Sequence, residues 1–548
     1  MDQQPCFPSV REKNLYKLIS MSAACFGIPG ELVKYGKPTV VEFSCSFFQT
    51  ISSIAFGRCL KQAFPDVKLV FGGPCFHGGM GEELIRKVPW IDAVSTGEAD
   101  DVIIPLFRAL SDGRSPSGLH GILYREKNGD VISGKPAKPV SKEILESLPD
   151  ADYSDYFRTL DKVGLSGAPG LNKLSYLLFE GSRGCWWGQK KHCLFCGLNA
   201  EGMEHRAKTG ERVFQTIANY VQKYPMRRFH ATDNNFSMKY FKTLFPKLKN
   251  SSFKDRLSLY FEVKVNLTRN QVREMSRAGV LFVQPGIESL STHILDLLLK
   301  GATSLLNIYF LKLCREYNIF TIWNNLIRVP GEKIEDYKEM EALIPKIIHL
   351  SPPCSSEGTR FIECHRFSPY FSEKDRWLTN LRPMPWYKAL FPSDKIDLSR
   401  IAYYFEADWK DTLDEGAYNA VTAMCRKWNR IWSESKILPG LYIHENEDKT
   451  LFIEDSRTEK AKTHRLDHVS SFVYRAISDP GNLRKVGGRV KKMSKKSLSD
   501  ERISLILRKF VTDSLAIEEK GKYCGLAIPE GVTEPLPQLR ALVYTNRN

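Results

Sequence analysis

The stretch that decides the fold is Gly181-Ser182-Arg183-Gly184-Cys185-Trp186-Trp187-Gly188, continued by Gln189-Lys190-Lys191-His192-Cys193-Leu194-Phe195-Cys196-Gly197-Leu198-Asn199. Seven residues separate Cys185 from Cys193, and two separate Cys193 from Cys196. Glycines surround these cysteines, and an apolar, strand-like run over 175–180 leads directly into them. Three thiols this close in one loop predict three ligands of one metal centre.

Thiolates are soft ligands that select zinc, copper(I) or iron–sulfur clusters. Three of them can hold three irons of a cubane 4Fe–4S cluster and leave the fourth iron open for another ligand. A zinc site needs a fourth ligand, which His192 or His205 could supply. The loop by itself therefore leaves both an iron–sulfur cluster and a zinc site open.

The composition indicates a multidomain protein of a reducing compartment. With 548 residues, 42% of them hydrophobic, the chain can form about three or four domains with their own cores. No apolar run approaches the ~18 residues of a membrane span, and residues 1–10 lack the pattern of a signal peptide. We therefore expect a cytoplasmic protein with no membrane partner. Thirteen cysteines in such a chain favour metal or redox chemistry over disulfides.

Positive charge is in excess. The 79 Lys and Arg against 63 Asp and Glu leave a net charge of +16, which favours an acidic partner or nucleic acid. Part of the excess gathers near the C-terminus, at Lys485, Arg489, Lys491, Lys492, Lys495 and Lys496.

Residues 1–135 alternate strand-like and helix-like patterns. The strand-like runs 39–44, 67–71 and 93–95 enclose helical patterns at 51–62 and 81–87. The second and third of these runs end on glycines. We expect a Rossmann-like domain with a parallel, doubly wound sheet, in which a ligand sits beyond the carboxyl ends of the strands. The glycines that mark this place are Gly72, Gly73 and Gly97.

A linker is expected over 136–172, where Pro, Asp and Gly interrupt the periodicity. A second, more regular alternation fills 173–395, with Thr268 as the N-cap of one of its helices. Six βα units in series predict a partial (β/α)6 barrel with its active groups on the loops after the strands. The strand-like segments are 175–180, 228–233, 258–265, 280–287, 319–327 and 359–367.

The C-terminal third departs from this rhythm. An aromatic-rich helical extension is expected over 396–449, a winged-helix-like module over 450–530, and a tail over 531–548. The module combines helices, one of them capped by Ser499, with a hairpin that turns at 520–522. Such a module can bind nucleic acid, or it can capture a peptide as an added strand.

Taken together, these residues resemble the radical SAM superfamily, in a version with seven residues where the common motif has three. Phe195 before the third cysteine belongs to this resemblance. The segments 184–188 and 196–203, with Gln284-Pro285-Gly286-Ile287-Glu288-Ser289, resemble one subgroup closely. That subgroup comprises radical SAM maturases of ribosomally synthesised peptides, which carry an N-terminal cobalamin-binding-type domain and include peptide C-methyltransferases. The resemblance runs from about residue 40 to 529.

The resemblance implies a function. Cys185, Cys193 and Cys196 would bind a 4Fe–4S cluster whose open iron chelates S-adenosylmethionine, and reduction would give a 5′-deoxyadenosyl radical that abstracts hydrogen from a carbon. Cobalamin in the N-terminal domain, at Gly72, Gly73 and Gly97, would supply the methyl group. A flavodoxin or ferredoxin would be the reductant. The C-terminal module would hold the leader of a precursor peptide; such leaders are often acidic, which suits its charge better than nucleic acid does.

Strand-end positions give the expected contacts to S-adenosylmethionine. Its sulfonium, amino group and ribose hydroxyls call for carboxylates, amides and hydroxyls, and an arginine suits its carboxylate. The expected residues are Arg183, Phe195, Asp233, Asn234, Glu262, Lys264, Gln284, Glu288 and Ser289.

Two features depart from the subgroup. Residues 1–38 show no clear first strand and helix for the cobalamin-type domain, and Arg328 stands where a glycine is usual. Two other functions therefore stay open. One is a cobalamin-independent radical SAM peptide epimerase or cross-linking enzyme, and the other is a non-catalytic, zinc-containing peptide-binding scaffold.

Overall fold

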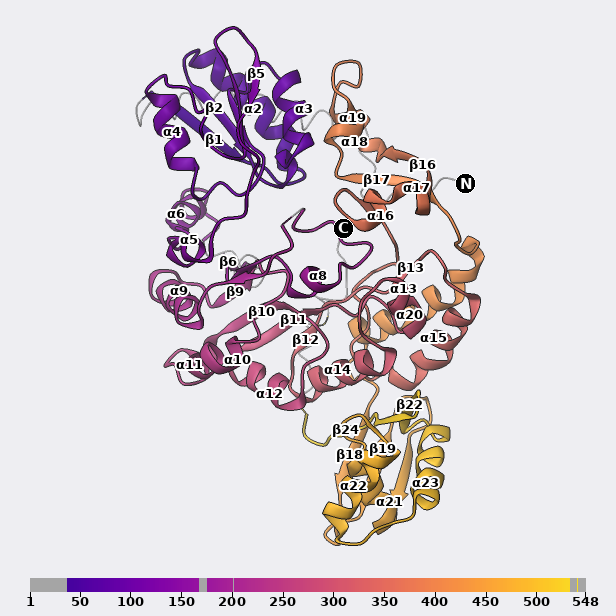
Figure 1. The fold of residues 1–548 in the computed structure, drawn as a ribbon. Helices are drawn as coiled ribbons and strands as arrows, with labels where there is room; N and C mark the ends of the chain where they lie inside the picture. The colour runs from indigo at the N-terminus through magenta and orange to yellow at the C-terminus, as the bar shows by residue number, and fades with distance from the viewer. Residues whose placement is uncertain (1–36, 167–174, 201, 533–539, 541–548) are drawn as a thin grey trace.

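A computed structural model describes residues 37–166, 175–200, 202–532 and 540. The first sheet along the described chain is mixed and has five strands, in the order β1-β2-β3-β4-β5 (Figure 1). Leu69 and Phe71 pack under α2 and α3, whereas Val70 packs with α4 on the other face. Helices thus cover both faces, as expected. The bounds are β1 (Val40–Ser44), α2 (Gln49–Ala63), β2 (Lys68–Gly72), α3 (Gly79–Lys87), β3 (Ala93–Ser95), α4 (Ile103–Ser111), β4 (Ile122–Arg125) and β5 (Val131–Ser133).

This sheet is parallel only over β1, β2 and β3, because β4 and β5 add to it antiparallel. The expectation of an all-parallel sheet was wrong at that edge. The first strand and helix looked for before Val40 fall on residues 1–36, outside the described part.

Two short helices, α5 (Lys142–Ser147) and α6 (Ser154–Lys162), occupy the predicted linker. Ser141 caps α5, and the Glu146 carboxylate accepts hydrogen bonds from the backbone and hydroxyl of Thr209. Polar residues that suggested a linker are therefore docked on the barrel.

Five parallel strands in the order β12-β11-β10-β9-β6 form the central sheet. Thr268 caps α12 with a complete capping box, as predicted. The bounds are β6 (Leu177–Phe179), α9 (Gly210–Lys223), β9 (Arg228–Ala231), α10 (Tyr240–Thr243), α11 (Phe245–Lys249), β10 (Ser258–Val263), α12 (Arg269–Arg277), β11 (Val280–Pro285), α13 (Thr292–Leu297), α14 (Ser304–Glu316) and β12 (Phe320–Thr321).

The fifth and sixth predicted strands are each divided in two. After β12 the chain bends, and Asn325 then bridges Glu288 before β13 (Leu326–Ile327) pairs in parallel with β14 (Arg360–Phe361). The sixth unit thus continues the barrel wall as a separate two-stranded sheet, reached through α15 (Ile334–Ile347).

A second difference concerns the predicted helical extension. Besides α20 (Asn419–Glu434), it contains a strand, β17 (Tyr404–Trp409), that lies between β15 (Cys364–His365) and β16 (Leu378–Pro383). Tyr, Phe and Trp favour strands, so β17 carried a signal that the helical interpretation overlooked. This small sheet packs against the N-terminal domain. Short helices flank it: α16 (Pro369–Ser372), α17 (Lys374–Trp377), α18 (Pro385–Leu390) and α19 (Leu398–Ile401).

At the opposite end of the barrel from the N-terminal domain lies the C-terminal part (Figure 1). It contains a four-stranded sheet, in the order β20-β19-β18-β24, three helices, and a three-stranded wing, in the order β21-β23-β22. Strand β24 follows the wing in the chain and returns to the four-stranded sheet. Ser499 caps α23 as predicted. The bounds are β18 (Leu441–Glu445), β19 (Leu451–Asp455), β20 (Lys462–Leu466), α21 (His468–Ala476), β21 (Gly481–Asn482), α22 (Leu483–Ser494), α23 (Asp500–Thr512), β22 (Ala516–Glu519), β23 (Lys522–Gly525) and β24 (Ile528–Pro529).

This part shares a continuous apolar core with the barrel. Lys312 of α14 donates to the carbonyl of Gly525 at 2.7 Å, and Arg269 pairs with Asp479 at 2.7 Å. Within the described residues, no helix is long and apolar enough to cross a membrane.

Candidate active site

A two-stranded ribbon closes the cysteine loop at its base. β7 (Ser182–Arg183) pairs antiparallel with β8 (Arg206–Ala207), so the two ends of the loop lie side by side. Gly184 has φ +76° and its Cα lies against the carbonyl of Glu204, which leaves no room for a side chain. Cys185 then caps α8 (Trp186–Lys190) by accepting from the Gly188 N–H. Figure 1 shows α8 between the barrel strands and the N-terminal domain.

All three thiols of the loop are free, and Cys193 is buried. Burial, with the neighbouring thiols, raises the pKa of Cys196 to about 12. Within the described residues, no three Cys, His, Asp or Glu side chains converge on one point as ligands of a single ion. A cubane cluster does not need such convergence, because each thiolate binds a different iron. The three thiols are therefore compatible with a 4Fe–4S cluster.

Two buried lysines stand beside the thiols. Lys264 Nζ donates to the Lys300 carbonyl at 2.6 Å and lies 4.2 Å from the ring centroid of Trp187. Burial and the Lys300 charge lower the pKa of Lys264 to about 8. Lys300 pairs with Glu288 at 2.9 Å and lies over the ring of Phe195 at 5.4 Å. Although burial opposes it, Glu288 and the sulfurs of Cys193 and Cys196 raise the pKa of Lys300 above its usual range, which favours its cationic form.

Lys300 was missed from the sequence. In the sequence, Lys300 is distinguished only as a charged residue that directly follows the apolar run Leu297-Leu298-Leu299. The next residue, Gly301 at φ +64°, lies directly under the ring of Trp187, whose Nε1 donates to the Leu299 carbonyl at 3.1 Å. Trp187 therefore packs as a wall of the site.

Two predicted carboxylates lie at the ends of adjacent strands. Asp233, after β9, is fully buried and accepts from the Gly181 N–H at 2.7 Å, while burial raises its pKa to about 7. Glu262 on β10 also has its pKa raised to about 7 by burial and by Glu288. It makes no hydrogen bond or ion pair with any described residue. Glu262 is thus a partly buried acid with no side-chain partner among the described residues, which suits contact with an amino group or hydroxyl of a cofactor.

The two predicted amides and the predicted hydroxyl lie in different places. Asn234 donates to the Asn199 side chain at 2.6 Å, and Gln284 accepts from the Tyr260 hydroxyl at 2.9 Å, so both lie at the rim of the strand ends. Ser289 is fully buried and contacts Met340 and the backbone of Ser291. Its hydroxyl faces the core behind the site, which corrects its assignment to the cofactor.

Arg183 also needs correction. Its guanidinium is engaged on both sides, by the two carboxylate oxygens of Asp100 at 2.6 and 3.1 Å and by Glu180 at 2.7 Å. These carboxylates raise its pKa above the usual range. No edge of this guanidinium is left for the carboxylate of S-adenosylmethionine.

The three predicted cobalamin glycines pack closely instead of lining open space. A Cβ on Gly73 would lie 2.6 Å from the Cys45 carbonyl oxygen, and one on Gly97 would lie 2.7 Å from the Ala137 Cβ. A Cβ on Gly72 would meet Ser95 at an ordinary 3.6 Å. Gly78 and Gly79 follow β2 and meet nothing within 4 Å. They lie at the start of α3, where an added side chain would meet open space.

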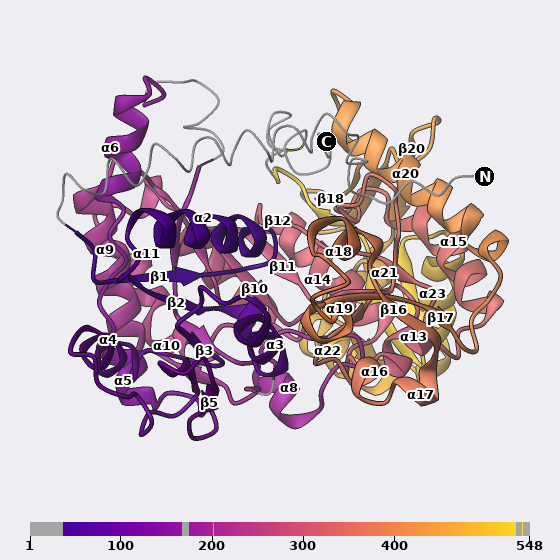
Figure 2. The same cartoon turned by 90° about the horizontal axis from the view of Figure 1, so that it is seen from above.

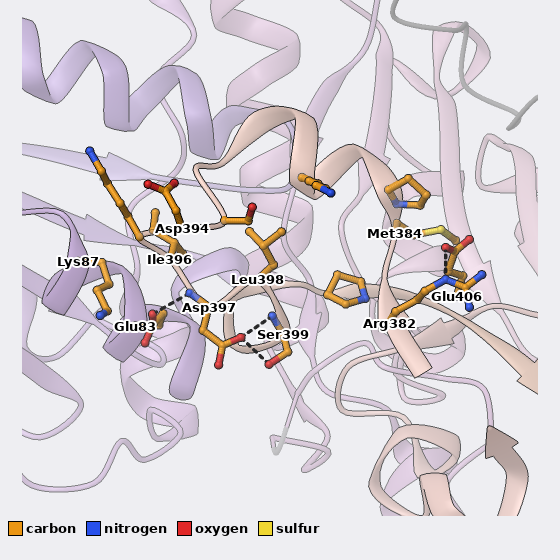
Figure 3. A pocket seen from close by; sticks show the side chains of 15 residues that line it. Glu83, Lys87, Arg382, Met384, Asp394, Ile396, Asp397, Leu398, Ser399 and Glu406 are labelled. Carbon is orange, nitrogen blue, oxygen red and sulfur yellow. Dashed lines mark hydrogen bonds and ion pairs between the residues drawn. The ribbon is translucent and has the colours of Figure 1, made fainter. Parts of the chain in front are cut away.

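A cavity of about 720 Å³ lies elsewhere, between α3 and residues 382–406 (Figure 3). Glu83 accepts from the Asp397 N–H there, and Arg382 pairs with Glu406. None of the predicted cofactor residues lines this cavity, so it is separate from the cysteine site.

Glu262→Gln is expected to have opposite effects on stability and on cofactor binding. The folded-state pKa of Glu262 is raised above its ordinary value of 4.5. The stability it provides is therefore complete below pH 4.5 and falls by roughly 3 kcal/mol as the pH rises through 7. The variant should lose this slope and melt at a higher temperature than the natural protein at pH 8. It should also bind S-adenosylmethionine at least about tenfold more weakly.

Melting curves at pH 5 and 8 and equilibrium binding on cluster-loaded protein measure both effects. Glu274→Gln is the control, since Lys249 lowers the pKa of that partly exposed carboxylate and the substitution should affect neither measurement strongly. Unchanged binding of S-adenosylmethionine would remove Glu262 from the site.

Comparisons with known proteins identify the central domain. The sequence model of the Radical SAM superfamily matches residues 179–344, from β6 to α15. An uncharacterized methyltransferase of Pyrococcus horikoshii is 27% identical over 340 residues, which are 61% of this chain and 70% of that protein.

Two solved structures share the fold. The radical S-adenosylmethionine methyltransferase TsrM from Kitasatospora setae is 16% identical, with a TM-score of 0.53 over 73% of this chain and 80% of its own. The cobalamin-dependent S-adenosylmethionine radical enzyme OxsB is 13% identical, with a TM-score of 0.54 over 90% of this chain and 67% of its own. Residues 179–344 are therefore a radical SAM domain, whose cofactors are a 4Fe–4S cluster and S-adenosylmethionine, and the chain shares its fold with TsrM and OxsB.

Proposed function

We propose that this chain is a cobalamin-dependent radical SAM enzyme that C-methylates a ribosomally synthesised precursor peptide. One observation carries the proposal. The cysteine loop, with Lys300 and the unpartnered Glu262, lies at the carboxyl ends of the barrel strands and is tied through Arg183 to the strand-end loop of the N-terminal sheet. This arrangement supports a site that lies between the cluster and the N-terminal domain.

When bound, the cluster and S-adenosylmethionine supply a carbon-centred oxidant, and cobalamin supplies a methyl group. The chain's own residues position the cofactors and shield them from water. Cys185, Cys193 and Cys196 hold the cluster, and the cations of Lys264 and Lys300 offset its negative charge. Glu262 and Gln284 orient the amino group and hydroxyls of S-adenosylmethionine. Trp187 and Phe195 exclude water from the site.

Cobalamin is supported by two observations. The structures of OxsB and TsrM, which share this fold, hold bound cobalamin. The open space at Gly78 and Gly79 lies beside the loop after β3, since the Gly78 N–H donates to the Thr96 carbonyl at 3.2 Å. Cobalamin would bind on this side of the N-terminal domain.

The peptide's leader is proposed to bind the C-terminal module at β20. This strand pairs only with β19 among the described residues, so its other edge can accept an added strand. Lys462 and Arg465 are exposed on it, and exposed Arg502 begins α23 nearby, where its charge acts on Asp467. Leu505 on the same helix is 68% exposed. Positive charge beside an exposed apolar side chain suits an acidic, partly apolar leader.

An acidic flavodoxin or ferredoxin is the proposed reductant, in a cytoplasmic setting. Lys190 and Lys191, at the end of α8 next to the cysteines, are exposed and make no ion pair with a described residue. Their charge would attract such a protein.

The experiment is coexpression with a precursor peptide whose gene neighbours that of this chain, followed by anaerobic purification. About four irons and one cobalamin per chain, and a peptide heavier by one or more methyl groups, are expected. Lys462→Glu with Arg465→Glu should reduce methylation of the leader-bearing peptide by about tenfold, through weaker binding. The matched exposed pair Lys374→Glu with Arg376→Glu should leave it unchanged.

Other results would select the alternatives. Iron without cobalamin, and a peptide changed only by deuterium uptake or loss of hydrogen, would indicate the epimerase or cross-linking enzyme. Zinc without iron would indicate the binding scaffold.

A further inference from the structure

A partly buried network of ion pairs joins the N-terminal sheet to the cysteine loop. Its acids are Glu98 and Asp100, in the loop after β3, and its bases are Arg183 on β7 and Arg206 on β8. Arg183 grips Asp100 with two nitrogens at 2.6 and 3.1 Å, and Arg206 grips Glu98 with two at 2.8 and 2.6 Å. We refer to these four residues as the clamp.

The clamp is built for rigidity. Both pairs are bidentate, which fixes orientation as well as distance. Arg206 is only 6% exposed, and it also donates to the Val140 carbonyl at 2.6 Å. Glu98 accepts in addition from the Val140 N–H at 2.9 Å. Each member is thus held by more than one bond.

The clamp lies where the N-terminal sheet meets the base of the cysteine loop. Arg183 and Arg206 are directly paired across the ribbon that closes the cysteine loop, so they hold both ends of that loop at once. Glu98 follows Gly97, which is itself packed against Ala137. The buried apolar side chains of the barrel and of the N-terminal sheet form separate clusters. Between these two bodies, the direct connection at the site is polar.

We propose that Glu98 and Asp100 are positioning residues that hold the carboxyl ends of the N-terminal strands at a set distance from the cysteine loop. This inference rests on the proposed function, because the distance matters when cobalamin and the cluster react with the same peptide carbon. A looser connection leaves each cofactor bound but separates hydrogen abstraction from methylation.

The test compares the natural holoenzyme with Glu98→Gln/Asp100→Asn. Both cofactors should remain bound, the dipolar distance distribution between the reduced cluster and cob(II)alamin should broaden, and methylated peptide per 5′-deoxyadenosine should fall at least about fivefold. Asp112→Asn is the matched control, since its pair with Arg114 in the same domain is exposed and should change nothing. Should the double variant fail to fold, Asp100→Asn alone keeps Glu98 in place and should show the same changes in smaller measure.

An unchanged distance distribution and an unchanged product ratio would overturn the clamp. Hydrogen exchange over 184–205 separates this from a failure of the proposed function. If the natural protein binds no cobalamin, faster exchange of this loop in the variant still supports the clamp, and equal exchange refutes it.

Discussion

Cys193→Ala is expected to abolish cleavage of S-adenosylmethionine, with the rate of 5′-deoxyadenosine formation falling by roughly a thousandfold or more, or about 4 kcal/mol. Two thiolates cannot hold three irons of the cluster, and S-adenosylmethionine then has no open iron to chelate. Iron content, the absorption spectrum of the cluster and chromatographic detection of 5′-deoxyadenosine measure this loss. The barrel should remain folded, because Cys193 is not part of its apolar core.

Cys314→Ala provides the comparison. Cys314 is completely buried in α14, far along the chain from the loop, so this variant loses a little packing and should keep its iron and its rate. A Cys193→Ala protein with four irons and the natural rate would refute the assignment of the cluster.

Lys300→Met is expected to destabilise the protein by about 3–5 kcal/mol, because it leaves Glu288 without its cation in a buried position. Adding Glu288→Gln should recover most of that loss, since the buried charge is then removed as well. Urea unfolding of the three proteins measures the difference. The single variant should also lower the reduction potential of the cluster, because a positive charge near Cys193 has gone.

Lys249→Met is the matched control for Lys300→Met. Its pair with Glu274 has the short distance of 2.6 Å but lies near the surface, so its loss should cost less than about 1 kcal/mol. Equal losses of unfolding free energy in the two variants would mean that the Lys300–Glu288 pair contributes no more to stability than a surface ion pair.

Features with a local signal could be predicted from the sequence. The cysteine spacing, the caps at Thr268 and Ser499, and the hairpin formed by β22 and β23 depend on residues close together in the chain. The alternation of apolar runs likewise located the strands of the barrel. Such features need no knowledge of the rest of the fold.

Features that depend on distant partners could not be predicted in this way. Arg183 looked available for S-adenosylmethionine because Asp100, which occupies it, lies 83 residues away. Ser289 looked like a strand-end hydroxyl because the burial that turns it toward Met340 comes from α15. Lys300 gained its role only from the thiols and Glu288 that surround it. What packs against Gly72, Gly73, Gly78 and Gly79 likewise depends on residues distant in the chain.

Because β7 pairs with β8, the length of the cysteine loop can change without changing the barrel that carries the loop. Since its first and last residues are tied to each other, and both are tied to the N-terminal domain, the chain leaves and re-enters the barrel at the same place whatever lies between. Additional residues can form a turn such as α8 without displacing any strand. The spacing of seven residues between the first two cysteines is thus a local elaboration, and loops of other lengths could be exchanged here as a unit.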